Sequence, residues 1–344
     1  MTMLRNFWYV AALAEEVNRQ PVQRILLGVP TALYRTQSGE PVAVRDVCSH
    51  RRAPLSLGKL VGDNIECPYH GMQFGPDGRC SLIPSQDSVA EAAHIRAFPV
   101  AERQGIVWIW PGDPAAADPA AIPHFPWRAS DQWHHDTSYY YHVQASHLLM
   151  TDNLLDLGHV AFVHADTIGF DPSALAHDPL VTDVVGDTVR NTRIIPDVEP
   201  SPAVQRWGGF TGRIERTSVS TWYPPCFTSI QFGNRDHAAN AELRIDHLIT
   251  PETDETHHYW VFVARNFEID DDVLTKQMRE DNDVVHHQDL VIVEAQQRMI
   301  ALTLGSIDMA IRQDKGLVQA HRIMDRLAAA ERSAATPGTG DPVR

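Results

Sequence analysis

The sequence has few cysteines and no long apolar run. Only four cysteines occur among 344 residues, so a disulfide framework is excluded as the basis of the fold in a chain of this size. No apolar stretch approaches the ~18 residues that a membrane-spanning helix needs, and residues 1–6 lack the apolar core of a signal peptide. We therefore expect a cytoplasmic protein without a membrane partner.

Positive charge is also scarce. The chain has 29 lysines and arginines against 44 aspartates and glutamates, which gives a formal net charge of −15. A nucleic-acid-binding domain needs a basic face, and anionic membranes attract basic segments. Neither is therefore an expected partner. Small substrates stay open, because local fields in a pocket override the net charge.

Two of the four cysteines stand close to histidines. The segments Cys48-Ser49-His50 and Cys67-Pro68-Tyr69-His70 each place one cysteine and one histidine in a short stretch. Two cysteines and two histidines are the ligands of a Rieske [2Fe–2S] centre. A zinc site is the alternative, but zinc fingers usually pair cysteine with cysteine and histidine with histidine. The mixed pairs favour a Rieske cluster held by Cys48, His50, Cys67 and His70.

The pattern of the chain changes near residue 110. Up to that point, short β-prone runs such as 31–35 and 41–45 alternate with glycine- and proline-rich turns, which predicts a small all-β domain with the Cys-His pairs in its loops. A stretch rich in proline, alanine and aspartate follows and marks a domain boundary. We assign residues 1–112 to the first domain, 113–332 to the second, and 333–344 to a disordered tail.

The second domain reads as a mixture of helices and strands. We expect a helix over 148–159, strands between 180 and 265, and two further helices over 271–304 and 318–332. The whole chain is therefore predicted to be α+β, with an N-terminal all-β domain followed by an α+β domain that has an antiparallel sheet and flanking helices.

A second candidate site lies in the first of these helices. His159 and His164 are five residues apart and would point roughly 140° apart on a regular helix. If both bind one metal, the helix must end or bulge near residues 158–163. Asn153, Asp156 and His159 are spaced by three and are expected to share a helical face.

Two histidines and one carboxylate form the facial triad of non-haem Fe(II) oxygenases. The carboxylate must come from elsewhere in the chain, and Asp289 on the long C-terminal helix is the first candidate, with Asp283 and Glu294 as alternatives. An electron-carrying cluster on the same chain needs an acceptor, which strengthens this interpretation. The non-enzymatic alternative is a Rieske electron carrier fused to a binding domain, without a second iron.

At these motifs the chain resembles the Rieske non-haem iron oxygenases, and within them the vanillate and dicamba O-demethylase oxygenase group. The segments CSHRRAPLS at 48–56, CPYHG at 67–71 and DNLLDLGH at 152–159 carry much of the resemblance. Further matching segments are residues 5–12, 108–113, 247–252 and 264–267.

The resemblance implies roles for the matched residues. Cys48, His50, Cys67 and His70 would hold the [2Fe–2S] cluster, and His159, His164 and Asp289 would hold a mononuclear Fe(II). It also implies a head-to-tail homotrimer in which Asp156 bridges a histidine of each metal site across the subunit boundary. Asn153 would lie beside the iron.

The resemblance further implies a reaction and its partners. The chain would be the terminal oxygenase component of a multicomponent monooxygenase, supplied with electrons by an NAD(P)H-dependent reductase. With O₂ it would O-demethylate a vanillate-like methoxylated aromatic to a phenol and formaldehyde. Ring hydroxylation, cis-dihydroxylation and N-demethylation are the alternatives. Candidate pocket residues, which could equally be core residues, are His247, Ile230 and Phe232, with Trp222 and Trp260 as further aromatic candidates.

Overall fold

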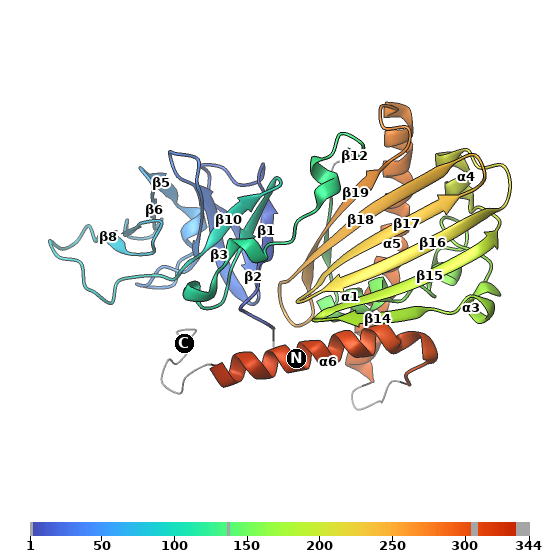
Figure 1. Cartoon of the computed structure of the whole chain (residues 1–344). Coiled ribbons are helices and arrows are strands. Elements are labelled where there is room, and N and C mark those ends of the chain that lie inside the picture. The colour runs from blue at the N-terminus through green and yellow to red at the C-terminus, as the bar shows by residue number, and fades with distance from the viewer. Residues whose placement is uncertain (1–2, 136–137, 304–308, 335–344) are drawn as a thin grey trace. The chain divides into compact units, whose positions relative to one another are not determined.

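The computed structural model divides the chain into two units (Figure 1). It describes residues 3–135, 138–303 and 309–334.

The first unit extends to Pro123 and includes Thr250–Thr253, and the second comprises the remaining residues from His124 onward. The proline-rich stretch before and after this point forms short 3₁₀ helices, η2 (Pro114–Ala116), η3 (Pro119–Ala121) and η4 (Pro126–Ala129). The domain boundary expected after residue 112 stays a prediction.

The first unit is built from short strands in three small antiparallel sheets. Their strand orders are β1-β11-β10, β2-β3-β4-β9 and β5-β6-β7-β8. The strands are β1 (Tyr9–Leu13), β2 (Val22–Leu26), β3 (Val29–Arg35), β4 (Pro41–Arg45), β5 (Lys59–Val61), β6 (Asn64–Glu66), β7 (Gln73–Phe74), β8 (Cys80–Leu82), β9 (Ala97–Phe98), β10 (Val100–Arg103) and β11 (Ile106–Ile109). The predicted all-β domain is therefore confirmed.

The core of the first unit includes both cysteines of the predicted cluster. Cys48 and Cys67 pack with Val44 of β4, Phe74 of β7 and Leu55 of the 3₁₀ helix η1 (Leu55–Leu57). Apolar packing on both sheets thus holds the two Cys-His loops next to each other.

The second unit contains an eight-stranded sheet in the described residues, with the order β12-β19-β18-β17-β16-β15-β14 and with β13 also paired to β19. Its strands are β12 (His134–His135), β13 (Tyr139–Val143), β14 (Val181–Val185), β15 (Thr188–Val198), β16 (Ile214–Tyr223), β17 (Phe227–Arg235), β18 (Asn240–Pro251) and β19 (His257–Arg265). The antiparallel sheet expected between residues 180 and 265 is confirmed.

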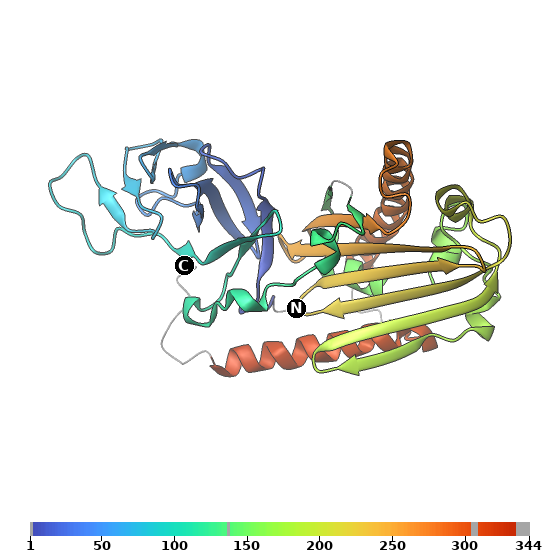
Figure 2. The same cartoon turned by 45° about the horizontal axis from the view of Figure 1, so that its top comes forward.

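Helices cover this sheet. α1 packs on β16 and β17, α5 packs on α1, and α6 lies against β14 and β15 (Figure 2). The helices are α1 (His147–Leu155), α2 (Val160–Val163), α3 (Ala174–His177), α4 (Pro202–Gly208), α5 (Asp272–Leu302) and α6 (Lys315–Ala334), with the 3₁₀ helix η5 (Arg312–Asp314) before α6. The overall α+β class is confirmed.

The long helix α5 presents a buried stripe to the rest of the unit. It starts at an N-cap, where the Asp271 carboxylate accepts the Leu274 N–H at 2.9 Å, and such caps stabilise helix starts by ~1 kcal/mol. The buried residues then recur every three or four positions; they are Leu274, Met278, Asn282, Val285, His286, Asp289 and Val293. The polar members of this stripe, such as Asp289, therefore face the interior of the unit.

The ends of two helices differ from those expected from the sequence. The helix expected over 148–159 ends at Leu155, because the chain leaves helical geometry at Asp156. The last helix, α6, extends to Ala334 and so includes the first two residues of the expected disordered tail. The rest of that tail, from residue 335 on, lies outside the described residues. None of the helices among the described residues combines the length and the apolar character that crossing a membrane requires.

Candidate active site

The two Cys-His loops of the first unit have the same backbone arrangement. In each loop the cysteine N–H donates to the carbonyl oxygen five residues later, at 2.9 Å for Cys48 and 2.8 Å for Cys67. In each loop the cysteine carbonyl accepts the N–H four residues later, from Arg52 and from Gly71. These two residues both have positive φ, 61° and 72°, a conformation that is uncommon for a residue other than glycine. The loops thus form two equivalent hydrogen-bonded turns.

The cysteine and histidine side chains of these loops differ in their exposure to solvent. Cys48 and Cys67 are each 2% exposed, whereas the rings of His50 and His70 are exposed, with their centroids 4.7 Å apart. Burial, together with the neighbouring Cys67, raises the pKa of the Cys48 thiol. Two buried sulfur donors and two adjacent surface imidazoles fit a Rieske cluster with its histidine-bound iron toward the surface.

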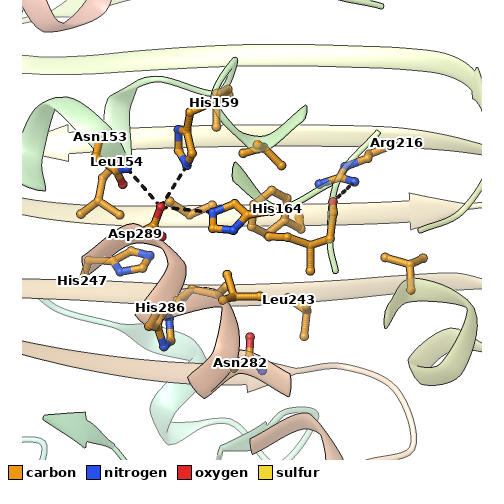
Figure 3. Close-up of a pocket in the computed structure, with 18 of the residues that line it drawn as sticks. Asn153, Leu154, His159, His164, Arg216, Leu243, His247, Asn282, His286 and Asp289 are labelled. Atoms are coloured by element: carbon orange, nitrogen blue, oxygen red, sulfur yellow. Dashed lines mark hydrogen bonds and ion pairs between the residues drawn. The ribbon is translucent and has the colours of Figure 1, made fainter. Parts of the chain in front are cut away.

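His159, His164 and Asp289 meet inside the second unit (Figure 3). One donor atom of each lies within 4.8 Å of the others. Asp289 Oδ1 is 3.4 Å from His159 Nε2 and 3.2 Å from His164 Nε2. Burial by itself would raise the pKa of Asp289, but the contacts with the two histidines lower it well below its usual range. The carboxylate is therefore an anion, as a metal ligand must be.

The opposite ring nitrogens of both histidines are also engaged. His159 Nδ1 donates to the backbone carbonyl of Asp156, and His164 Nδ1 donates to Gln288 Oε1 at 2.8 Å. Such bonds fix the tautomer and the orientation of a metal-ligating imidazole. In this tautomer each Nε2 would be available to bind an iron. Gln288 was not identified from sequence, and only its position next to Asp289 could have suggested it.

A break in the chain between α1 and α2 makes this geometry possible. The Asp156 N–H closes the end of α1 on the carbonyls of Asp152 and Asn153, and α2 starts at Val160. The expected break is confirmed, although it begins at Asp156 rather than near residues 158–163. The expectation that Asn153, Asp156 and His159 share one helical face is wrong, because the last two lie beyond the helix.

Gly158 lies at this break and is closely approached by two side chains. A Cβ atom there would lie 2.0 Å from Gln313 Oε1 and 2.9 Å from Asp156 Oδ1. Any other residue would displace the ends of these two side chains.

The structure brings Asp289 to the two histidines and directs the alternative carboxylates elsewhere. Asp283 accepts the Tyr141 hydroxyl at 2.7 Å, and Glu294 accepts the Gln144 N–H at 3.0 Å. Asn153 donates from Nδ2 to Asp289 Oδ1 at 3.1 Å, while its own Oδ1 is buried without a hydrogen-bond partner in the described chain. Asn153 therefore positions the carboxylate of Asp289.

A pocket adjoins the triad and is walled by the sheet. Ile230 and Phe232 of β17 and His247 of β18 all line it. In the strand register Ile230 lies opposite Ile245, and Phe232 lies opposite Leu243, so alternate residues of both strands face the pocket. Trp222 and Trp260 are fully buried and do not line this pocket, which favours the alternative that they are core residues.

His247 carries an unused ring nitrogen in this pocket. Its Nδ1 lies 2.6 Å from the Tyr259 hydroxyl, and its Nε2 is buried without a partner among the described residues. Burial lowers the pKa of His247 to about 3 and raises that of Tyr259 well above its usual value. The ring is therefore neutral. The Tyr259 proton has no other acceptor in the described chain, so it goes to Nδ1 and leaves Nε2–H as a donor.

The sequence matches two family models. The Rieske [2Fe-2S] domain matches residues 7–99, and the vanillate O-demethylase oxygenase C-terminal domain matches residues 143–330. The chain is a Rieske oxygenase of the vanillate O-demethylase group. Like the observed triad, this membership argues against a Rieske electron carrier without a second metal site.

Several relatives of this Rieske oxygenase match over nearly their full length. The toluene-4-sulfonate monooxygenase system iron-sulfur subunit of Comamonas testosteroni is 35% identical over 97% of this chain and 99% of its own. A vanillate O-demethylase oxygenase subunit of a Pseudomonas species is 34% identical over 96% of both chains. The crystal structure of dicamba monooxygenase bound to 3,6-dichlorosalicylic acid has a TM-score of 0.89 at 33% identity, covering 97% of this chain and 100% of that one.

As a Rieske oxygenase, the chain is an oxidoreductase with two cofactors, a [2Fe–2S] cluster and a mononuclear iron. The donor sets of both units fit them: cysteine and histidine pairs for the cluster, and two histidines with one carboxylate for the iron. Oxygenase components of this kind receive electrons from a reductase or ferredoxin partner and act on an aromatic substrate.

Proposed function

We propose that this chain is the terminal oxygenase component of a multicomponent monooxygenase that O-demethylates a vanillate-like methoxylated aromatic to a phenol and formaldehyde. The observation that carries the proposal is the buried His159–His164–Asp289 triad opening onto a largely apolar pocket. The vanillate O-demethylase relative supports the choice of reaction.

Different residues of the pocket have different proposed roles. When bound, the iron supplies the activation of O₂ with electrons from the partner. His159, His164 and Asp289 would hold this iron as a facial triad. The side chains of Ile230, Phe232, Leu243 and Ile245 offer an apolar surface for an aromatic ring and exclude water from the reacting carbon.

His247 is proposed to orient the substrate. Its neutral Nε2–H would donate to a phenol or acid oxygen of the aromatic, and Tyr259 would keep the imidazole in the donating tautomer. We expect His247→Ala to raise KM about fivefold, because a lost neutral hydrogen bond is worth ~1 kcal/mol, with a smaller change in kcat. Steady-state kinetics on the true substrate measure this.

A matched control is His257→Ala. His257 is also buried on the sheet, but its Nδ1 bonds to the Ala145 carbonyl at 2.7 Å and it does not line the pocket. An unchanged KM in His247→Ala would remove that residue from substrate binding.

We also propose the assembly and partners that the family resemblance implies. These are a head-to-tail homotrimer and an NAD(P)H-dependent reductase. A cytoplasmic location goes with this proposal, since NAD(P)H is a cytoplasmic reductant.

Asp156 would bridge the two metal sites in the trimer. One of its oxygens accepts the Gly158 N–H at 2.7 Å, while the other is 4.0 Å from His159 Nδ1, and the side chain is 32% exposed.

Asp156→Asn tests this bridge. Asparagine has the same size and can still accept the Gly158 N–H, but it lacks the charge that would hold two imidazoles. We expect both metals to be retained and turnover to fall roughly 10- to 100-fold, the usual effect of removing an outer-shell partner. Asp152→Asn, four residues earlier on α1 and paired with His321 at 2.8 Å, is the control. Full activity of Asp156→Asn would contradict the bridging role.

The function itself is tested without the partner reductase. The purified protein is reduced chemically, freed of reductant, and mixed with O₂ and a series of methoxybenzoates and methoxyphenols. We expect near-stoichiometric formaldehyde from one of them, measured against the iron content. Hydroxylated ring or diol products would contradict O-demethylation and indicate ring hydroxylation or cis-dihydroxylation. Formaldehyde formed only from N-methyl substrates would indicate N-demethylation.

A second candidate function is hydroxylation of an aryl methyl group. It is favoured by the similarity to the toluene-4-sulfonate monooxygenase subunit over nearly the whole chain. The same single-turnover assay with 4-toluenesulfonate separates the two, because methyl hydroxylation yields a benzylic alcohol and no formaldehyde.

A further inference from the structure

A buried arginine lines the substrate pocket without an acidic partner. Arg216 of β16 is 4% exposed. Its Nη1 donates to the carbonyl oxygens of Ile168 at 2.6 Å and Gly169 at 3.3 Å, while its Nε is buried without a partner in the described chain. Burial lowers the pKa of Arg216 to about 10, so the guanidinium remains charged at neutral pH.

Another buried arginine of this unit, Arg193, has acidic neighbours. Burial lowers the pKa of Arg193, and the carboxylates of Asp156 and Asp178 oppose this effect. For Arg216, burial is the only influence on the pKa. An unpaired buried charge is costly. The two carbonyl oxygens and the rings of Phe170 and Phe232, each with its centroid 5.4 Å from the guanidinium carbon, offset only part of that cost. A missing anion would complete the site.

The strand register places Arg216 at one end of a sheet face. Arg216 lies opposite Asn234, and the next pocket-facing rows contain Phe232, then Ile230, and finally His247. The pocket-lining residues of the two middle rows are apolar and include Leu243 and Ile245. The pocket wall thus has the imidazole of His247 at one end, apolar side chains in the middle, and the guanidinium of Arg216 at the other end.

The metal triad lies toward the other end of this wall. The Ser220 hydroxyl, in the row of Ile230, donates to the Leu154 carbonyl next to Asn153, and His247 lies beside His286 of α5. Figure 3 shows Arg216 reaching into the pocket from one side, with the triad on the other. Ile230 and Asn234 are four residues apart, a span of ~13 Å, which an aromatic ring and the arginine side chain can bridge together.

Asn234 supplies a second polar group beside Arg216. Its side chain is 5% exposed, and its Oδ1 is buried without a partner in the described residues. Because the two ends of an amide exchange by a simple rotation, the same position can present an NH₂ donor.

We propose that Arg216 and Asn234 bind an oxyanion carried by the aromatic substrate, at the end of the pocket remote from the metal triad. This inference rests on the proposed function and names its substrate class: an aromatic carboxylate or sulfonate whose oxidised methyl or methoxy group lies across the ring from the acid. A planar guanidinium binds such oxygens in pairs.

Two variants test the site in different ways. Arg216→Met removes the charge. Asn234→Asp keeps Arg216 and its carbonyl contacts but supplies a carboxylate next to the guanidinium, and so it remains informative if the first variant does not fold. We expect each to weaken the binding of anionic ligands by about 30-fold or more, and that of a neutral ligand by less than threefold.

Binding is measured on the holoprotein by equilibrium dialysis without O₂. The ligands are 4-methoxybenzoate, 4-toluenesulfonate and neutral 4-methoxyacetophenone, and the anion that wild type binds more tightly identifies the oxyanion. Arg265→Met is the control, since Arg265 is buried on β19 but does not line the pocket; it should keep the wild-type preference for anions.

Two results would overturn the anion site. One is wild-type protein that binds the neutral ligand as tightly as both anions. The other is an equal loss for all ligands in both variants, which would leave Arg216 as a tether for the chain at residues 168–169. Because no turnover is involved, selective anion binding without formaldehyde in the single-turnover assay would contradict O-demethylation and still support the oxyanion site.

Discussion

Replacing Asp289 with alanine should empty the mononuclear metal site and reduce turnover by more than ~100-fold, since even partners outside the ligand set cost 10- to 100-fold when removed. Asp289 supplies the only carboxylate oxygen that the described chain brings within reach of both His159 Nε2 and His164 Nε2. Without it, only two imidazoles remain as ligands. We expect iron content to fall by one atom per chain, while the visible spectrum of the Rieske cluster is unchanged.

Two carboxylates on the same helix are matched controls for this experiment. Asp283→Ala and Glu294→Ala remove acids that contact Tyr141 and the Gln144 N–H instead of the histidines. Both variants should keep the full iron content. Retention of the mononuclear iron in Asp289→Ala, or its loss in Glu294→Ala, would mean that the third ligand has been misassigned.

Replacing Cys67 with serine should remove the [2Fe–2S] cluster and with it all reductase-driven turnover. The cluster needs thiolates on one of its irons, and a buried serine hydroxyl does not ionise to take their place. Cys67 also packs in the core with residues of the β2-β3-β4-β9 and β5-β6-β7-β8 sheets. Losing a cross-link between the two Cys-His loops should therefore lower the thermal stability of the first unit. Visible absorption, acid-labile sulfide and thermal unfolding measure these effects.

Cys80→Ser is the matched control for the cluster. Cys80 is half-buried on β8, where its thiol contacts the Leu82 carbonyl at 3.4 Å, and the variant should keep its colour. A coloured, sulfide-containing Cys67→Ser protein would contradict the assignment. Colourless wild-type protein with stoichiometric zinc would instead revive the zinc alternative.

The cluster site could be predicted because its chemistry is local. Each loop holds its cysteine and histidine within four residues, so the donor set is visible before any fold is known. The structure adds the shared turn that closes on Arg52 and Gly71. Sequence pattern alone could not predict this turn, because arginine rarely adopts positive φ.

The mononuclear site was predictable only in part. The pair His159 and His164 could be recognised, and the need for a helix break followed from the angle between them. The position of the break at Asp156 depended on backbone capping and on the close approach of Gln313 to Gly158. The capping is local but is not encoded by residue spacing, and the approach of Gln313 is a tertiary contact, so the expected shared face of Asn153, Asp156 and His159 failed.

The sequence by itself determined the domain types and the candidate ligands within the two Cys-His loops and at residues 159 and 164, because short-range spacing and hydrophobic periodicity encode them. Only the tertiary structure decided between Asp289 and its neighbours on α5, since three carboxylates on one helix differ only in the face that packs inward. It also suggested the proposed roles of Asn234 and Arg216. These two residues look ordinary in the sequence, and strand register brings them to one pocket, where burial makes each unpaired polar group matter.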